Sequence, residues 1–228
     1  MSNKFYITTA IDYPNSRPHL GHALEKVQTD VLARYHRLLG EDVFFLTGSD
    51  ENAQKNVLAA EEAGIPVKEF IDKIVKVFQQ MIQLLNISND YFIRTADQKK
   101  HWPGIIKIWK ECIKSDDIYK KEYKGLYCVG CEAFLTEKDL KDGLCPEHLK
   151  APEKVSEENY FFRLSKYEKQ LQKLIEKDKL KIIPEKRKNE ILSFIKSGLR
   201  DLSVSRPKER MRGWGIPVPG DNNQKIYV

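Results

Sequence analysis

The amino-acid sequence predicts an α/β protein, with a parallel sheet in its first half and a small cysteine-bearing insertion after it. Up to about residue 116, short segments rich in β-branched and aromatic residues alternate with longer segments of helical periodicity, which is typical of parallel βαβ units. Beyond that point the segments become short and rich in turn formers, and three of the four cysteines fall within eighteen residues. Ligands of an open parallel sheet bind at the carboxyl ends of its strands, so functional residues are expected there.

The elements of the first half follow from local pattern. A buried strand is predicted over residues 4–11, and turn formers fill residues 12–18 before a helix begins at His19. Apolar residues then recur at intervals of three and four until Gly40 ends the helix. The elements expected next are a strand over 42–48, helices over 50–64 and 66–86, a strand over 90–95, and a helix over 98–116 that Pro103 and Gly104 interrupt.

The second half is predicted from a change of pattern. Residues 118–149 form a short, turn-rich module, and residues 158–164 are strand-like. Helices are predicted over 165–178 and 185–198, and residues 212–228 return to loop and strand.

Composition sets broad limits on function. The chain has 228 residues, 41% of them apolar and 32% charged, which is enough for one large domain or one domain with an insertion. Its formal net charge of +6 mildly favours a polyanionic partner, although a basic enzyme fits equally well. A run of eighteen apolar residues, a signal peptide and a transit pattern are all absent, so we expect no membrane association and a cytoplasmic protein.

The cysteine cluster predicts a metal site. Cys128 and Cys131 form one C-x2-C pair, and Cys145 and His148 form a second pair, separated from the first by thirteen residues. Four such ligands close a tetrahedral zinc site without an open position, so the metal is expected to be structural, within a knuckle over residues 125–150. The alternatives are incidental thiols beside a histidine, or a redox C-x2-C that leaves Cys145 and His148 without a role.

The segment "PHLGH" places two histidines where the first helix begins. His19 and His22 are three residues apart and therefore share one face of the first turn. That turn also presents backbone N–H groups and the positive end of the helix dipole, which together favour an anion such as a nucleotide phosphate. Gly21 between them would let a flat ring approach the backbone. A histidine pair without any ligand is an equally acceptable interpretation of the spacing.

A wider set of segments adds a family to this interpretation. "PHLGH" resembles the H-I-G-H signature of class I aminoacyl-tRNA synthetases. Further sequence segments resemble those of methionyl-tRNA synthetases in the same order, and together they span essentially the whole chain. They are "TAIDYPNSRPHLGHALEKVQTDVLARYHRLLGEDVFFLTGSDEN", "GLYCVGCEAFLTEKDL", "GLCPEHL", "ENYFFRLSKY", "DLSVSRP" and "WGIPVPGD".

The resemblance implies ATP-dependent activation of methionine and its transfer to tRNA(Met), with methionine, ATP and tRNA as partners and Mg²⁺ accompanying ATP. By matching positions, His19 and His22 would be catalytic, and with Gly21 they would bind ATP. The fold would be Rossmann-like, with a connective-peptide insertion that carries the zinc knuckle. The implied domains are residues 1–114, the first half of the nucleotide-binding catalytic domain; 115–200, the insertion; and 201–228, a return to the catalytic domain.

The resemblance also implies a methionine pocket, formed by Ala10, Ile11, Tyr13 and Asp50. Apolar walls and an aromatic ring suit a thioether, and the Asp50 carboxylate would take the methionine ammonium. Asp50 could instead cap a helix that begins near Glu51. Arg206 matches an arginine near the family's active site, although a surface ion pair is the alternative.

The sequence departs from the family in two places. Many relatives have D-E-H-G where this chain has Asp50 to Ala53, so Asn52 replaces a histidine that can become cationic. The chain also ends before the W-F-D-A segment and the K-M-S-K-S loop, so we expect it to carry only the N-terminal part of the catalytic machinery and to be inactive alone. A non-catalytic zinc-binding module that binds tRNA or a partner protein is the competing hypothesis, and another class I synthetase is a third.

Overall fold

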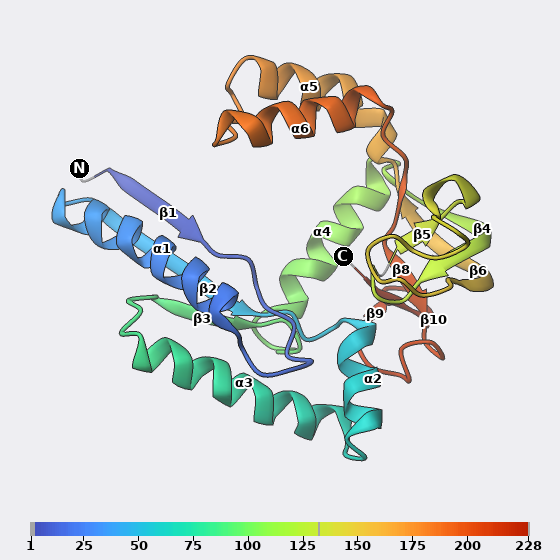
Figure 1. Cartoon of the computed structure of the whole chain (residues 1–228), viewed down its shortest axis with the longest axis horizontal. Helices are drawn as coiled ribbons and strands as arrows, with labels where there is room; N and C mark the ends of the chain where they lie inside the picture. Colours follow the sequence, from blue (N-terminus) through green and yellow to red (C-terminus); the bar gives the residue numbers. More distant parts are fainter. Residues whose placement is uncertain (1–2, 132, 228) are drawn as a thin grey trace.

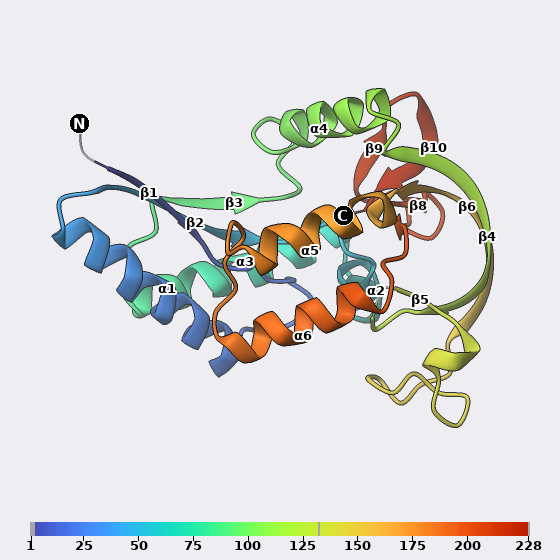
Figure 2. The ribbon, with the colours of Figure 1, turned by 90° about the horizontal axis from the view of Figure 1, so that it is seen from above.

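The computed structural model describes residues 3–131 and 133–227, and its first half is built on a parallel sheet (Figure 1). β1 (Lys4–Thr8) pairs with β2 (Asp42–Ser49), which pairs with β3 (Tyr91–Arg94), and both pairings are parallel. The connecting helices α1 (Leu20–Leu38) and α3 (Val67–Leu84) lie on the same face of this sheet (Figure 2). The predicted parallel α/β sheet is therefore confirmed.

Two further helices complete this half. α2 (Gln54–Glu62) lies between β2 and α3, and α4 (Trp102–Lys114) follows β3. The sequence predicted α2 from residue 50, but residues 50–53 form no regular secondary structure, and Ala53 is the N-cap without a side-chain cap bond. Pro103 stands in the first turn of α4, where its missing N–H has no helical partner to lose, so the helix begins there rather than being interrupted.

β1 is less buried than the sequence predicted. It ends at Thr8, and within the described residues it pairs only with β2 and is covered on one face. Phe5 stacks on His36 of α1, with ring centroids 3.5 Å apart, whereas Tyr6 on the opposite face is 63% exposed. A strand with one covered face buries only alternate side chains, so its apolar run did not mean full burial.

The helix predicted from His19 is confirmed, but its apolar stripe is not the face that packs on the sheet. The stripe, which runs from Leu20 to Leu39, is exposed, including Leu20 at 88% and Val31 at 60%. The buried face of α1 carries Lys26, Thr29, Asp30 and Ala33. Periodicity therefore predicted the helix correctly without identifying its inner face.

The second half is an antiparallel β structure. Its largest sheet has the order β5-β4-β6-β7, and the smaller one has the order β8-β10-β9. The elements of these sheets are β4 (Ile118–Cys128), β5 (Ala133–Leu135), β6 (Glu153–Phe162), β7 (Leu202–Ser203), β8 (Ser205–Pro207), β9 (Ile216–Val218) and β10 (Asp221–Ile226). The sequence described residues 118–149 only as turn-rich and missed the eleven-residue strand β4, which pairs with β6 along ten residues.

Helical segments complete this half. The short 3₁₀ helices are η1 (Glu137–Asp139) and η2 (Leu164–Tyr167). α5 (Glu168–Glu176) and α6 (Glu185–Lys196) form a helical hairpin near the top of Figure 1. The helices predicted over 165–178 and 185–198 are thus confirmed. A small core of Ile175, Ile195 and Leu199 holds the hairpin together.

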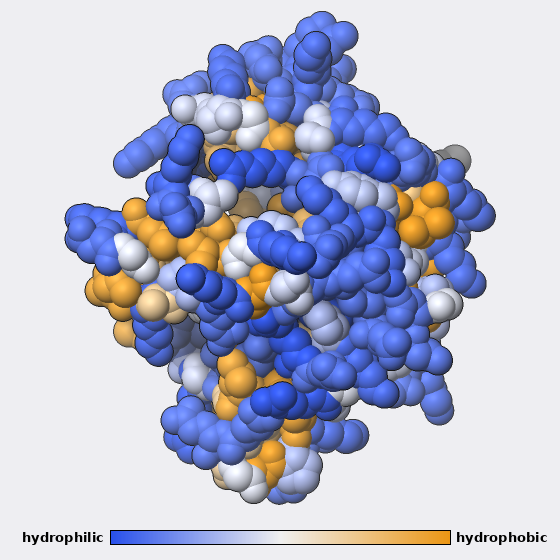
Figure 3. All heavy atoms as spheres, turned by 90° about the vertical axis from the view of Figure 1, so that its right-hand side faces the viewer, coloured by the Kyte–Doolittle hydropathy of each residue, from blue (hydrophilic) through white to orange (hydrophobic). Residues whose placement is uncertain are grey.

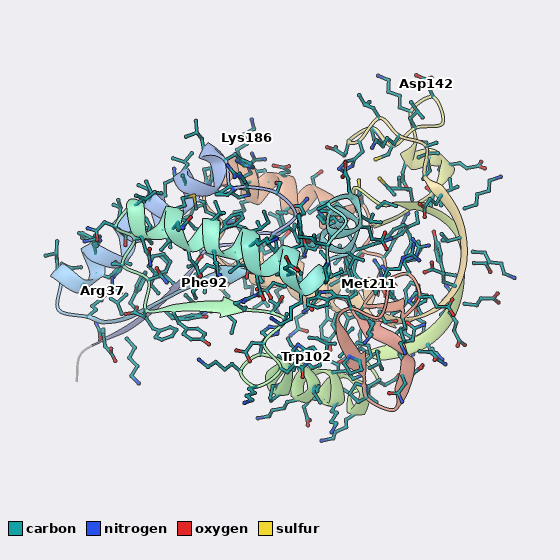
Figure 4. The ribbon with its side chains drawn as sticks, turned by 90° about the horizontal axis from the view of Figure 1, so that it is seen from below. Arg37, Phe92, Trp102, Asp142, Lys186 and Met211 are labelled. Atoms are coloured by element: carbon teal, nitrogen blue, oxygen red, sulfur yellow. The ribbon has the colours of Figure 1, made fainter. Side chains whose placement is uncertain are left out.

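The main core joins the two halves. Trp109 of α4 packs with Ile118 of β4 and with Val204, Ile216 and Ile226 from the last part of the chain. Met211, labelled in Figure 4, is fully buried, whereas Asp142 lies at the outer tip of the cysteine-bearing segment. The face that carries β4 and β6 is mostly hydrophilic, with apolar side chains in separate patches (Figure 3). No helix of the described residues is long and apolar enough to cross a membrane.

Candidate active site and metal centre

The candidate site lies where β1 and β2 end. Asp12 forms an isolated parallel bridge with Ser49, and the Asp12 amide donates to the Gly48 carbonyl at 3.3 Å. The Asp50 amide donates in turn to the Asp12 carbonyl at 2.8 Å. The loop after β1 and the turn after β2 are therefore tied together at the carboxyl edge of the sheet, as parallel topology requires.

The two predicted histidines cap the N-terminus of α1 reciprocally. His19 is the N-cap, and its Nδ1 accepts from the Gly21 amide at 3.1 Å. The Nδ1 of His22 accepts from the His19 amide, also at 3.1 Å, and the two rings stack with centroids 3.8 Å apart. Because both Nδ1 atoms accept, each neutral ring carries its proton on Nε2. Both Nε2–H groups are thus left to donate to other partners.

The groups around His22 shift its pKa in opposite directions. Its Nε2 is 3.9 Å from Asp12 Oδ1, and its ring packs edge-on against Phe78 of α3. Burial lowers the pKa of His22 below its ordinary value and outweighs Asp12, which acts to raise it, while His19 and Lys26 lower it further. His22 is therefore a neutral hydrogen-bond donor at neutral pH.

Gly21 has a steric role in this arrangement. A Cβ at position 21 would lie 2.9 Å from His19 Cε1 and 3.0 Å from its Nδ1, closer than side-chain carbons ordinarily approach. The glycine therefore makes room for the His19 ring itself. Its predicted contact with adenosine stays a prediction.

The residues matched to a methionine pocket surround the same loop. Ala10 and Tyr13 are exposed, Ile11 is half-buried, and the ammonium of Lys55 lies 4.0 Å from the centre of the Tyr13 ring. Asp50 does not cap α2, since the helix begins later, but its carbonyl accepts from Asn56 Nδ2 at 2.9 Å. The structure thus brings this set together with the histidine pair, without testing what it binds.

Arg206 lies elsewhere in the fold. It belongs to β8, is only 3% exposed, and its guanidinium is 4.4 Å from the centre of the Tyr227 ring. Its Nη1 donates to Ser203 Oγ at 2.9 Å and to the Ser205 carbonyl at 2.8 Å. The alternative of a surface ion pair is therefore wrong, while a role in the active site stays a prediction.

Sequence reasoning missed several charged residues at this edge. Lys26 and Asp12 form a buried ion pair of 2.8 Å directly behind His22. Glu51 is fully buried, and its carboxylate accepts hydrogen bonds from Arg94 Nε at 2.6 Å and Nη2 at 3.1 Å. The position of Lys26 near the site could have been predicted from the sequence, because a residue four positions after His22 lies on the same helix face.

The predicted metal ligands converge. One ligand atom from each of Cys128, Cys131, Cys145 and His148 lies within 4.8 Å of all the others. Cys131 Sγ is 3.4 Å from Cys145 Sγ and 3.3 Å from His148 Nδ1, and all three cysteines are free of disulfides. This donor set and spacing suit a tetrahedral ion with soft ligands. A Cβ on Gly130 would lie 2.3 Å from His148 Cδ2, so the glycine allows the histidine to reach the cluster.

The fold and the site define a class of protein. A parallel sheet whose first strand is followed by a helix that begins at the sequence H-L-G-H resembles the class I aminoacyl-tRNA synthetases. The model of one family within that class, described as tRNA synthetases class I (M), matches residues 5–151 and 138–228. The chain belongs to this family.

Similar proteins agree with this assignment. A methionine–tRNA ligase of Clostridium tetani is 48% identical over 98% of this chain, and one of Brucella suis is 46% identical over 99%. The chain spans 34% and 44% of the length of these two relatives.

Solved structures give the same result. Mycobacterium tuberculosis methionyl-tRNA synthetase in complex with methionyl-adenylate is 41% identical and superposes with a TM-score of 0.92 over 99% of this chain and 44% of that one. The free form of the same enzyme gives a TM-score of 0.81 at 38% identity, over 100% of this chain and 43% of that one.

Proposed function

We propose that this chain forms the methionine- and ATP-binding part of a methionine–tRNA ligase. The observation that carries the proposal is the stacked pair His19–His22, which caps α1 at the carboxyl end of β1. Asp50, held against the same loop through the Asp12 carbonyl, supplies a carboxylate beside it. A phosphate site next to an ammonium site is what activation of an amino acid by ATP requires.

In this reaction the methionine carboxylate attacks the α-phosphorus of ATP, and pyrophosphate leaves. His19 and His22 use their Nδ1 atoms to accept from backbone amides, so their Nε2–H groups donate to phosphate oxygens as charge builds there. The N-terminal end of α1 adds its positive partial charge. Mg²⁺ would accompany ATP, and tRNA(Met) would receive the methionyl group.

For methionine, Asp50 is the proposed partner of the ammonium group. Tyr13, Ala10 and Ile11 provide an aromatic ring and apolar surface of the kind that suits a thioether. Arg206 is too deeply buried to reach a ligand without movement of its aromatic neighbours, so any influence on the site would be indirect.

One Zn²⁺ is proposed for Cys128, Cys131, Cys145 and His148, where it would stabilise a segment with little apolar core of its own. We keep the division into residues 1–114, 115–200 and 201–228 as a proposal. A cytoplasmic location is also proposed, because free cysteines in a candidate metal site suit a reducing compartment.

The test is methionine-dependent ATP–pyrophosphate exchange by the protein as its gene encodes it. His22→Asn should lower kcat by about a hundredfold or more, with little change in the methionine KM, because its donor acts on charge that develops in the transition state. His36→Asn, near the other end of α1, is the matched control and should retain activity. A His22→Asn enzyme within about threefold of wild type would contradict the proposal. The 228 residues alone are expected to show no exchange.

A further inference from the structure

Lys26 is an unusual residue for the inner face of a helix. Its side chain is 1% exposed, and burial of a lysine is costly unless its ammonium is paired. Three oxygens surround the ammonium: Asp12 Oδ2 at 2.8 Å, the Ala10 carbonyl at 3.0 Å and Glu25 Oε2 at 3.4 Å. Two of these three come from the loop after β1 rather than from α1.

Ala10 is held from both of its backbone groups. Its amide donates to Glu25 Oε1 at 2.7 Å, and its carbonyl accepts from Lys26 Nζ and also from Thr9 Oγ1 at 2.6 Å. Glu25 and Lys26 are neighbours on α1, so two adjacent side chains of that helix fix one residue of the loop.

Asp12 connects the contacts of Glu25 and Lys26 with Ala10 to both the nucleotide side and the methionine side of the candidate site. Its carboxylate pairs with Lys26 and lies 3.9 Å from His22 Nε2, on the nucleotide side. Its carbonyl accepts from the Asp50 amide at 2.8 Å, on the methionine side. The residue that anchors Lys26 is therefore also the one through which the two sides of the site touch.

We propose that Lys26 is a positioning residue, which through the Asp12 carboxylate and the Ala10 carbonyl holds the methionine-binding loop in register with His22. The proposal rests on the function proposed above. A lysine suits this task because one ammonium donates in three directions and so joins acceptors from different segments. An uncharged side chain of similar length would fill the space without fixing the loop. Lys26 also shields His22 from the full effect of the nearby Asp12 charge.

The experiment compares Lys26→Met with Lys225→Met in the complete protein. Lys225 is the matched control, because its ammonium is also buried and donates to a carbonyl, that of Gly215 at 3.1 Å, in the β8–β10 sheet. Hydrogen exchange should become about tenfold faster at the amides of residues 10–12 in Lys26→Met and stay unchanged there in Lys225→Met. The methionine KM should rise in Lys26→Met alone, with kcat falling less.

A second readout is the titration of the His22 ring followed by NMR. The charged groups that face this ring are Asp12, His19, Lys26 and Glu25. Loss of the Lys26 charge leaves Asp12 uncompensated, so the titration midpoint of His22 should move upward. An unmoved midpoint would show that the Lys26 ammonium does not act on the Asp12–His22 pair.

Each outcome decides the question. Unchanged exchange at residues 10–12 in Lys26→Met, or an equal change in Lys225→Met, would overturn the proposal. If Lys26→Met does not fold, the double variant Asp12→Asn/Lys26→Met, which removes both buried charges, is measured instead. This double variant should fold and still show faster exchange at residues 10–12. Exchange as slow as in wild type would overturn the proposal. If wild type lacks methionine activation, the proposed function fails, whereas the exchange and titration results still decide whether Lys26 holds the loop.

Discussion

Replacement of Arg94 by methionine should destabilise the protein strongly, because it leaves the fully buried Glu51 without its cationic partner. Arg94 ends β3 and binds Glu51 through two nitrogens, at 2.6 and 3.1 Å, while its Nη2 also reaches Asp72 of α3 at 2.6 Å. Burial opposes the charge on Arg94 and on Asp72. Hydrogen bonds to Glu51 and Asp72 nevertheless raise the pKa of Arg94, and hydrogen bonds from Lys68 and Arg94 lower the pKa of Asp72. The guanidinium therefore joins the end of β3, the segment after β2 and α3, next to Asp50 in the chain.

The magnitude follows from the difference in burial. Breaking a buried ion pair by removing one partner costs about 3–5 kcal/mol. Arg94 is 34% exposed whereas Glu51 is 0% exposed, so water can reach one side of the pair and the lower end of the range, about 3 kcal/mol, applies. With a urea m value of about 3 kcal/mol/M for a chain of this size, the midpoint should fall by about 1 M.

The assay is urea unfolding followed by circular dichroism. The double variant Glu51→Gln/Arg94→Met should lose less stability than Arg94→Met, because the buried carboxylate is then gone. Lys68→Met is the matched control: it removes a cation that pairs with the same Asp72 but is 77% exposed, and it should cost less than about 1 kcal/mol. A loss of less than about 1 kcal/mol for Arg94→Met would refute the reasoning.

Two other predictions concern the metal centre and acid stability. Cys145→Ser should reduce bound zinc to well below one equivalent by metal analysis, whereas Cys112→Ser, outside the cluster, should retain it; equal zinc in both would contradict the assigned ligands. Burial raises the pKa of Asp30, but hydrogen bonds from Ser88 and Arg34 outweigh it and leave the pKa lowered. Asp30 thus stabilises the fold above about pH 4, and this contribution is lost as the pH falls through its lowered pKa. Asp30→Asn should therefore flatten the acid side of a stability-against-pH curve, and an unchanged slope would count against it.

Local features of this protein could be predicted from its sequence. The helix start near His19, the proximity of His19 and His22, and the two ligand pairs of the metal centre depend on residues a few positions apart. Backbone geometry fixes such distances before any tertiary contact forms, so short spacing carries structural information. The order of strands and helices in the first half could also be predicted, because each element has its own periodicity.

The tertiary structure decided which faces and charges are buried. The apolar stripe of α1 predicted a helix, yet Lys26 and Asp30 occupy its inner face, because their partners Asp12 and Ser88 come from other segments. Arg206 is indistinguishable in sequence from a surface arginine and is buried against aromatic rings from β4, β5 and the end of the chain. The burial of a charged side chain depends on whether a distant segment supplies its counter-charge, and local periodicity contains no information about that partner.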